Sequence, residues 1–259
     1  MKIDLEKAKK QFLEYTKTFN LEDEKLKNKQ EHSIRVMEIS KEIAKRMKLE
    51  QEEIELATLI GLLHDIARFE QFKKYNTLRD SISIDHGDYG VEILEKEIRK
   101  YIQNNEYDEI IKKAVKNHNK YEIEKGLTEK EILFAKIVRD ADKIDIFYES
   151  AKIFWKGKEE VVENSTTTNE IVEQFKQGNQ IKKNGEIKPE NTINKIIFVL
   201  GFIYDINFIE SFEIVKENDY INKILDRYNI KDKYTKQAVE EIRQKGNLYI
   251  KQKIEKNEG

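Results

Sequence analysis

Histidine is scarce in this chain, and each histidine continues the apolar stripe of an expected helix. The chain of 259 residues contains only His32, His64, His86 and His118. An imidazole can bind a metal through either ring nitrogen or move a proton near neutral pH. Carboxylates accompany these rings, because Asp65 follows His64 directly and Asp142 stands on the inner stripe of another helical segment.

A buried imidazole or carboxylate costs free energy unless it is hydrogen-bonded, paired or bound to a metal. A single histidine on an inner face could simply be hydrogen-bonded within the core. Asp142, taken alone, could be a buried helix cap or part of a salt bridge. The whole set on the inner faces of separate helices requires a common cause. Imidazole nitrogen and carboxylate oxygen suit iron, manganese, zinc, nickel or cobalt. A set this large, without sulfur ligands, favours a catalytic metal site over a closed structural one.

The elements that would position these residues are helices, and we predict an all-α fold. Apolar residues recur every three to four positions, and Glu and Lys fill the other faces. One proline and 10 glycines are too few for a turn-rich β architecture. We expect helices near residues 3–18, 29–48, 51–68, 87–104, 106–120, 128–150, 168–177, 190–205, 208–217, 219–228 and 232–256.

Some helix starts carry recognisable signals, and two stretches lack periodicity. Asp85 precedes the helix that His86 opens and is expected to cap it. Thr128 and Glu131 form a capping-box pattern before an apolar run. Residues 69–85 are expected to form a long loop, and residues 156–192, which include Gly185 and Pro189, an irregular segment.

Composition excludes several classes of protein. The chain lacks cysteine, which excludes disulfides, iron–sulfur clusters and a thiol nucleophile. It has 48 basic and 50 acidic residues, so no global positive field would attract nucleic acid. The longest apolar stretch, Ile196 to Tyr204, is far shorter than the about 20 residues that a membrane span needs. The N-terminus has no apolar core like that of a signal peptide, so we expect a cytoplasmic protein. From the balanced charge and the short apolar stretches we expect neither a nucleic-acid nor a membrane partner.

The chemistry-bearing residues resemble the HD-domain metal-dependent phosphohydrolases. That family has a His, then a His-Asp pair, then a distant Asp, each on a different helix. Here His32 is followed by His64-Asp65 within LLHDIARFE and by Asp142 within RDADKID. The resemblance implies an HD-domain helical bundle with a core over 25–150 that carries the ligands. We expect it within a single helical domain over 1–259, with a C-terminal helical extension at 190–259.

The resemblance also implies the roles of the ligands. His32, His64, Asp65 and Asp142 would bind one divalent ion, and Asp65 would bridge it to a second ion held by His86 and His118. Iron or manganese is expected first, and zinc, nickel or cobalt is also compatible with these ligands. Between the ions a water would lose its proton and attack a phosphate ester, with Asp65 as a catalytic residue.

Two further cations are candidates for the catalytic site. Arg68 stands three residues after Asp65, where cyclic-dinucleotide phosphodiesterases of this superfamily have a lysine, and it would contact phosphate or form a helix-end salt bridge. Lys143 follows Asp142 directly, and a structural role is the simpler interpretation for it.

The resemblance implies a small phosphorylated substrate of the nucleotide or cyclic nucleotide class. The sequence after His118, NKYEIEKG, lacks the Gly-Tyr-Pro signature of cyclic di-GMP phosphodiesterases. The sequence after Asp65, IARFE, lacks the Glu-Asp pair of guanosine-tetraphosphate hydrolases. Two alternatives use the same residues: a di-iron oxygenase of the HD fold, and a metal-binding sensing module without turnover.

Overall fold

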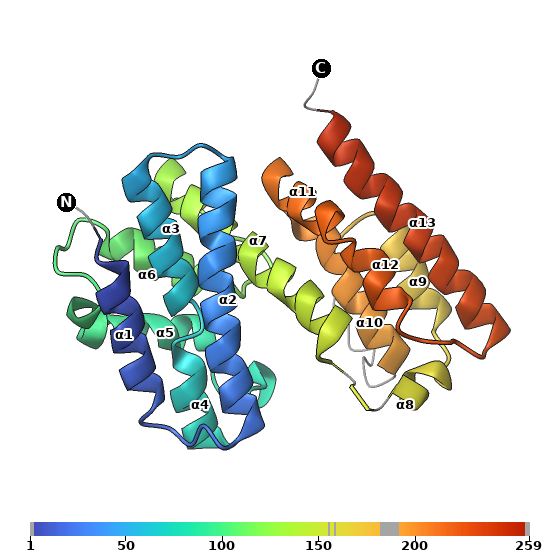
Figure 1. The fold of residues 1–259 in the computed structure, drawn as a ribbon, viewed down its shortest axis with the longest axis horizontal. Coiled ribbons are helices and arrows are strands. Elements are labelled where there is room, and N and C mark those ends of the chain that lie inside the picture. Colours follow the sequence, from blue (N-terminus) through green and yellow to red (C-terminus); the bar gives the residue numbers. More distant parts are fainter. Residues whose placement is uncertain (1–2, 155, 158, 182–191, 257–259) are drawn as a thin grey trace. The chain divides into compact units, whose positions relative to one another are not determined.

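The computed structural model describes residues 3–154, 156, 157, 159–181 and 192–256. These residues form helices joined by turns and loops, with no strand among them, and the all-α prediction is confirmed (Figure 1). The chain divides into two compact units, Met1–Asp142 and Lys143–Gly259. That the whole chain folds as a single domain stays a prediction.

The first unit contains the helices that carry the histidines. Its elements are α1 (Leu5–Thr16), α2 (Glu24–Arg46), α3 (Gln51–Leu63), α4 (Ala67–Tyr75), η1 (Asp80–Ile82), α5 (His86–Glu97), η2 (Ile98–Lys100), α6 (Asp108–Asn117) and the first part of α7 (Glu129–Lys152). Helix α3 packs between α1 and α2 (Figure 1). Helix α5 packs against both α4 and α6. The result is a bundle in which the ends of several helices meet around one core.

A glycine allows α2 and α3 to pack closely. A Cβ atom at Gly61 would lie 2.5 Å from Ser40 Oγ and 2.8 Å from the carbonyl oxygen of Val36. Any larger side chain would therefore push the two helices apart. Because His32 lies on α2 and His64 follows α3, this close contact helps to bring the two imidazoles together.

The two predicted helix-start signals are confirmed, whereas the helix expected from residue 29 begins earlier, at Glu24. The carboxylate of Asp85 accepts hydrogen bonds from the amides of Gly87 at 2.9 Å and Asp88 at 3.1 Å. The capping box also forms, since Glu131 accepts from the amide of Thr128 at 2.7 Å and donates its own amide to Thr128 Oγ1 at 3.3 Å. Such caps satisfy amides that have no partner within the helix.

Two predicted element boundaries near His64 and Asp65 were wrong. The helix expected over 51–68 ends at Leu63, and a turn over residues 64–66 follows it. The loop expected over 69–85 is shorter, because its first residues belong to α4, whose last residue is Tyr75. Asn76 then ends the helix with a left-handed backbone conformation, φ 51°. Helix α4 buries the polar Gln71 beside Ala67 and Phe69, so its sequence lacks the sustained apolar periodicity that marks a helix.

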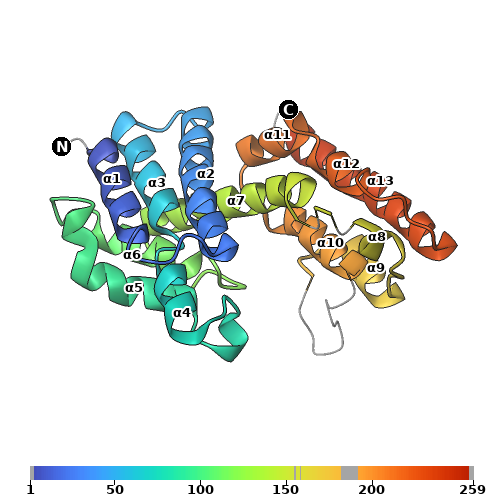
Figure 2. The ribbon, with the colours of Figure 1, turned by 60° about the horizontal axis from the view of Figure 1, so that its bottom comes forward.

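The second unit consists of short helices packed beside one long helix. Its elements after α7 are α8 (Glu159–Glu163), α9 (Asn169–Lys176), α10 (Thr192–Leu200), η3 (Gly201–Asp205), α11 (Ile209–Glu217), α12 (Tyr220–Leu225) and α13 (Lys233–Glu255). Helix α13 packs against α9, α11 and α12 (Figures 1 and 2). The prediction of additional C-terminal helices is confirmed. In the stretch expected to be irregular, α8 also forms, and α9 agrees with the helix expected near 168–177. Gly185 and Pro189 lie outside the described residues.

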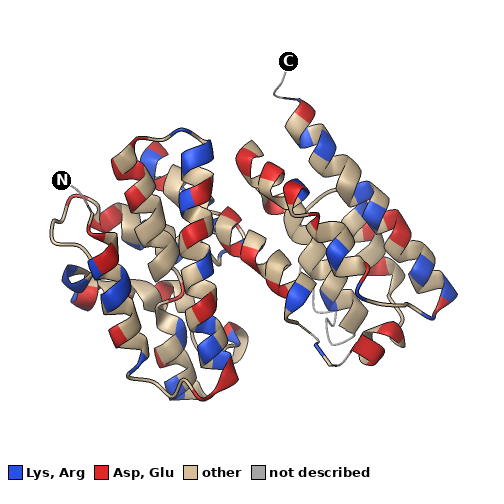
Figure 3. Cartoon of the chain, viewed as in Figure 1, with Lys and Arg blue, Asp and Glu red and all other residues tan. Residues whose placement is uncertain are grey.

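Charges of both signs are interspersed along the helices of each unit (Figure 3). This distribution agrees with the net charge of −2. Within the described part of the chain, no helix combines the length and the apolar character that a bilayer crossing requires.

Candidate metal centre

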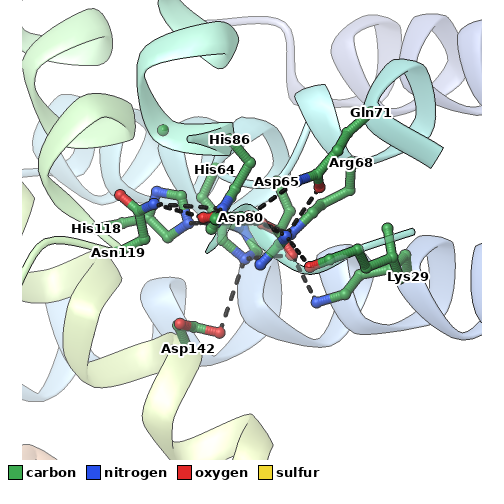
Figure 4. A network of polar contacts seen from close by, with 12 residues as sticks. Lys29, His64, Asp65, Arg68, Gln71, Asp80, His86, His118, Asn119 and Asp142 are labelled. Carbon is green, nitrogen blue, oxygen red and sulfur yellow. Dashed lines mark hydrogen bonds and ion pairs between the residues drawn. The ribbon is translucent and has the colours of Figure 1, made fainter. Parts of the chain in front are cut away.

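The structure brings all of the predicted ligands together in the first unit. His32 lies on α2. His64 and Asp65 lie in the turn after α3, His86 at the start of α5, His118 directly after α6, and Asp142 on α7 (Figure 4). The imidazoles and the Asp65 carboxylate are buried, with exposed fractions of 0–4%. A cluster of this kind requires a partner for each polar atom.

One part of the cluster consists of His32, His64 and Asp142. The Nε2 atom of His32 lies 3.2 Å from His64 Nε2 and 3.1 Å from Asp142 Oδ1. Asp65 reaches the same place with its Oδ2 atom, which lies 3.6 Å from His32 Nε2 and 3.7 Å from His64 Nε2. His32, His64 and Asp142 thus form a group whose ligand atoms converge closely enough to hold a metal ion.

The other part consists of His86 and His118. Their Nε2 atoms lie 2.9 Å apart. The Oδ1 atom of Asp65 lies 3.3 Å from His86 Nε2 and 3.5 Å from His118 Nε2. Asp65 therefore directs one oxygen to each pair of imidazoles.

The other ring nitrogens show which atoms carry protons. His64 Nδ1 lies 2.8 Å from the carbonyl oxygen of Gly61, and His118 Nδ1 lies 2.6 Å from that of Val115. A carbonyl oxygen only accepts hydrogen bonds, so both Nδ1 atoms must donate. In the neutral rings Nε2 then carries a lone pair directed into the cluster.

These contacts fit a bound cation and are unfavourable without one. A cation with ligand bonds near 2.0–2.2 Å has its ligand atoms about 3 to 3.6 Å apart. Most of the separations above fall in or near this range, and the largest, between His64 Nε2 and Asp142 Oδ1, is 3.9 Å. Asp65 Oδ1 is buried and accepts no hydrogen bond from any described residue. A buried acceptor without a donor, facing imidazole nitrogens at this spacing, fits a metal ligand.

Electrostatics keep the ligands in their metal-binding protonation states. Burial lowers the pKa of His64 to about 3 and that of His86 to about 4, so both rings are neutral at pH 7. Burial opposes ionisation of Asp65, but the positive charge of Lys29 and of other nearby groups holds its pKa well below the usual range. Burial likewise opposes ionisation of Asp142, and its hydrogen bond with His32 reverses the effect and lowers the pKa.

The structure places the two cationic candidates in different surroundings. The Nη1 atom of Arg68 donates to Asp80 Oδ1 at 2.8 Å, to the carbonyl oxygen of Leu78 at 2.7 Å and to Gln71 Oε1 at 2.9 Å. Its Nε atom lies 3.4 Å from Asp65 Oδ1. Lys143 belongs to the second unit, where its Nζ atom lies 2.7 Å from Asp205 Oδ2. Their predicted catalytic roles stay predictions.

Sequence reasoning missed two polar residues at this centre. Lys29 lies one helical turn before His32, and its Nζ donates to Asp65 Oδ2 at 2.8 Å. The spacing of three residues from His32 was a usable signal, but Lys is common on the helix surfaces of this chain. Asp80, in the segment expected to be a loop, accepts from His86 Nδ1 at 2.5 Å. No local pattern in the sequence indicates that contact.

Comparison with known proteins gives one match. The sequence profile of the HD domain family matches residues 30–146, which lie within the core expected over 25–150. No curated protein and no solved structure matches the chain. Members of the HD family are mostly metal-dependent phosphohydrolases. Residues 30–146, which contain the whole buried cluster of histidines and aspartates, therefore form an HD domain.

Proposed function

We propose that this protein is a metal-dependent phosphohydrolase that cleaves a phosphate ester of the nucleotide or cyclic nucleotide class. The observation that carries the proposal is the orientation of Asp65, whose Oδ1 faces His86 and His118 and whose Oδ2 faces His32 and His64. A carboxylate that serves two groups of imidazoles suits a pair of divalent cations. Two-metal sites of this kind stabilise both the attacking and the leaving oxygen in phosphoryl chemistry.

Each residue of the centre has a defined task in this proposal. His32, His64 and Asp142 would hold one cation, and His86 and His118 the other, with Asp65 shared between them. Bound there, divalent cations would lower the pKa of a water and neutralise the charge of a phosphate ester. Neutral imidazoles are ready to bind, because their burial makes protonation unfavourable.

Lys29 supports the assignment to a phosphorylated substrate. Its side chain is 25% exposed and forms an ion pair with Asp65. It is therefore a cation that touches the centre and also meets solvent. We expect Lys29 to contribute positive charge toward a phosphate group, because a mobile ammonium can pair with either carboxylate or phosphate oxygens.

Turnover of phosphate esters by the metal-loaded protein tests this function. The protein loaded with Mn²⁺ or Fe²⁺ is assayed against mononucleotides, cyclic nucleotides and an aryl phosphate ester. We expect release of phosphate or a nucleoside monophosphate, and its loss in His64→Asn. The matched control is Glu38→Gln on α2, because the Glu38 side chain is 54% exposed and forms an ion pair with Lys41 on the same helix.

Two results would contradict the proposal. Oxygen uptake with a mixed-valent iron signal, without phosphate release, would identify the di-iron oxygenase. Binding of metal with no turnover of any phosphoester would identify the sensing module.

A further inference from the structure

The geometry points to Asp80 as a positioning residue that selects the tautomer of His86 and thereby directs the lone pair of His86 Nε2 into the metal centre. This inference rests on the proposed metal site, but its main observable belongs to the metal-free protein. Asp80 lies outside the HD sequence pattern of His, His-Asp and Asp, and it lies on η1 between α4 and α5.

Two groups compete for His86 Nδ1. Asp80 Oδ2 lies 2.5 Å away and can only accept a hydrogen bond when ionised. Asn119 Nδ2 lies 3.3 Å away and can only donate. With Asp80 as the partner, Nδ1 carries the proton and Nε2 is free to bind a cation. With Asn119 as the partner, the proton moves to Nε2 and the ring cannot bind through that atom. On the other side of the ring, Nε2 faces two acceptors that could hold the proton there, His118 Nε2 at 2.9 Å and Asp65 Oδ1 at 3.3 Å. The contact with Asp80 is the shortest of all and goes to a charged acceptor, so it is the strongest and keeps the proton on Nδ1.

Asp80 is itself held in place from the opposite side. Its Oδ1 atom accepts from Arg68 Nη1 at 2.8 Å and from Gln71 Nε2 at 2.9 Å, as Figure 4 shows. Arg68 is also its ion-pair partner, and a permanent positive charge at this distance favours the ionised form of the Asp80 carboxyl. Asp80 therefore faces His86 as a carboxylate whose orientation is fixed.

This arrangement predicts the effect of the nearly isosteric change Asp80→Asn. The single carbonyl oxygen of the new amide would have to serve the donors Arg68 and Gln71, so its NH₂ group would face His86. Both neighbours of His86 Nδ1 would then be donors. The ring would shift its proton to Nε2, and the cation shared by His86 and His118 would lose a ligand.

Nitrogen NMR of the histidine rings in ¹⁵N-labelled protein with a chelator measures the tautomer directly. An unprotonated ring nitrogen resonates far downfield of a protonated one. The His86 signals are identified by their disappearance in His86→Asn, which is practical because the chain has only four histidines. We expect the Nδ1–H form in the unaltered protein and the Nε2–H form in Asp80→Asn. An Nε2–H ring in the unaltered protein would overturn the inference without any variant at position 80.

Metal titration gives the second readout. Calorimetry with Mn²⁺ should show about 10- to 100-fold weaker binding of one equivalent in Asp80→Asn, as is typical for loss of a group that orients a metal ligand. The control is Asp88→Asn. Asp88 is two residues from His86, and its carboxylate forms an ion pair with Lys120. Wild-type Mn²⁺ affinity together with an unchanged tautomer in Asp80→Asn would refute the role of Asp80. Because the tautomer is read without metal or substrate, this result is independent of whether the protein hydrolyses phosphoesters.

Discussion

The Oδ1 atom of Asp65 lies 3.3 Å from the Nε2 atom of His86, and no described residue donates a hydrogen bond to that oxygen. With the His86 proton on Nδ1, as inferred above, two acceptor atoms face each other in a buried place, and Arg68 Nε lies 3.4 Å from the same oxygen. A divalent cation between the two acceptors would make this arrangement favourable. The relationship makes Asp65 and His86 the first residues to test.

Replacement of Asp65 should affect both cations. Asp65→Ala removes an oxygen from each group of imidazoles, so we expect metal content to fall in both positions and kcat to decrease by about 100-fold or more. Metal analysis by mass spectrometry and steady-state kinetics on the same preparation measure the two effects. A variant that keeps all of its metal and near-normal turnover would refute the bridging role.

Replacement of His86 or His118 should affect only one cation. Either residue changed to Ala removes a ligand from the second group and leaves His32, His64 and Asp142 intact. We expect the metal-to-protein ratio to fall by about half, with the remaining ion bound normally. An unchanged ratio would favour a mononuclear centre in which both histidines act on substrate or water.

Replacement of Arg68 distinguishes a structural role, which would affect the free energy of unfolding, from a role in substrate binding, which would affect KM. Its Nη1 atom donates to Asp80, Gln71 and the carbonyl oxygen of Leu78. Arg68→Ala leaves these acceptors without that donor, so we expect the free energy of unfolding to fall by about 1–3 kcal/mol. Urea unfolding measures the change, and the control is Arg79→Ala, at the position between Leu78 and Asp80. Unchanged stability with a raised KM would instead support the predicted contact with phosphate.

The stability of the metal-free protein should fall as the solution becomes acidic. The pKa values of His64 and His86 are lowered by burial to about 3 and about 4, from 6.5. Between these values the unfolded chain binds protons that the folded state excludes, so stability is complete above about pH 6.5 and is lost as the pH falls. From pH 7.5 to 5.5 we expect a loss of about 2–3 kcal/mol for the two rings together. Urea unfolding with a chelator measures the loss, and His86→Asn should lose about half as much.

The helical class and the inward position of the histidines could be predicted from the sequence for a simple physical reason. Periodicity of apolar residues is a local property, because each helical turn is set by residues three and four positions apart. The same property placed His32, His64, His86 and His118 on inner faces, and their scarcity made them conspicuous. The short helix α4 was missed because its buried face includes the polar Gln71, which interrupts the apolar repeat.

The contacts of Lys29 and Asp80 depend instead on how distant segments pack. Lys29 is 36 positions from Asp65, and Asn119 is 39 positions from Asp80. Nothing local distinguishes this lysine from others on helix surfaces, or this aspartate from others in turns. The α2–α3 contact and the return of residues 76–85 toward α4 and α5 bring these side chains to the histidines. Proximity across such separations arises from side-chain packing in three dimensions, which no pattern within a single helix or loop encodes.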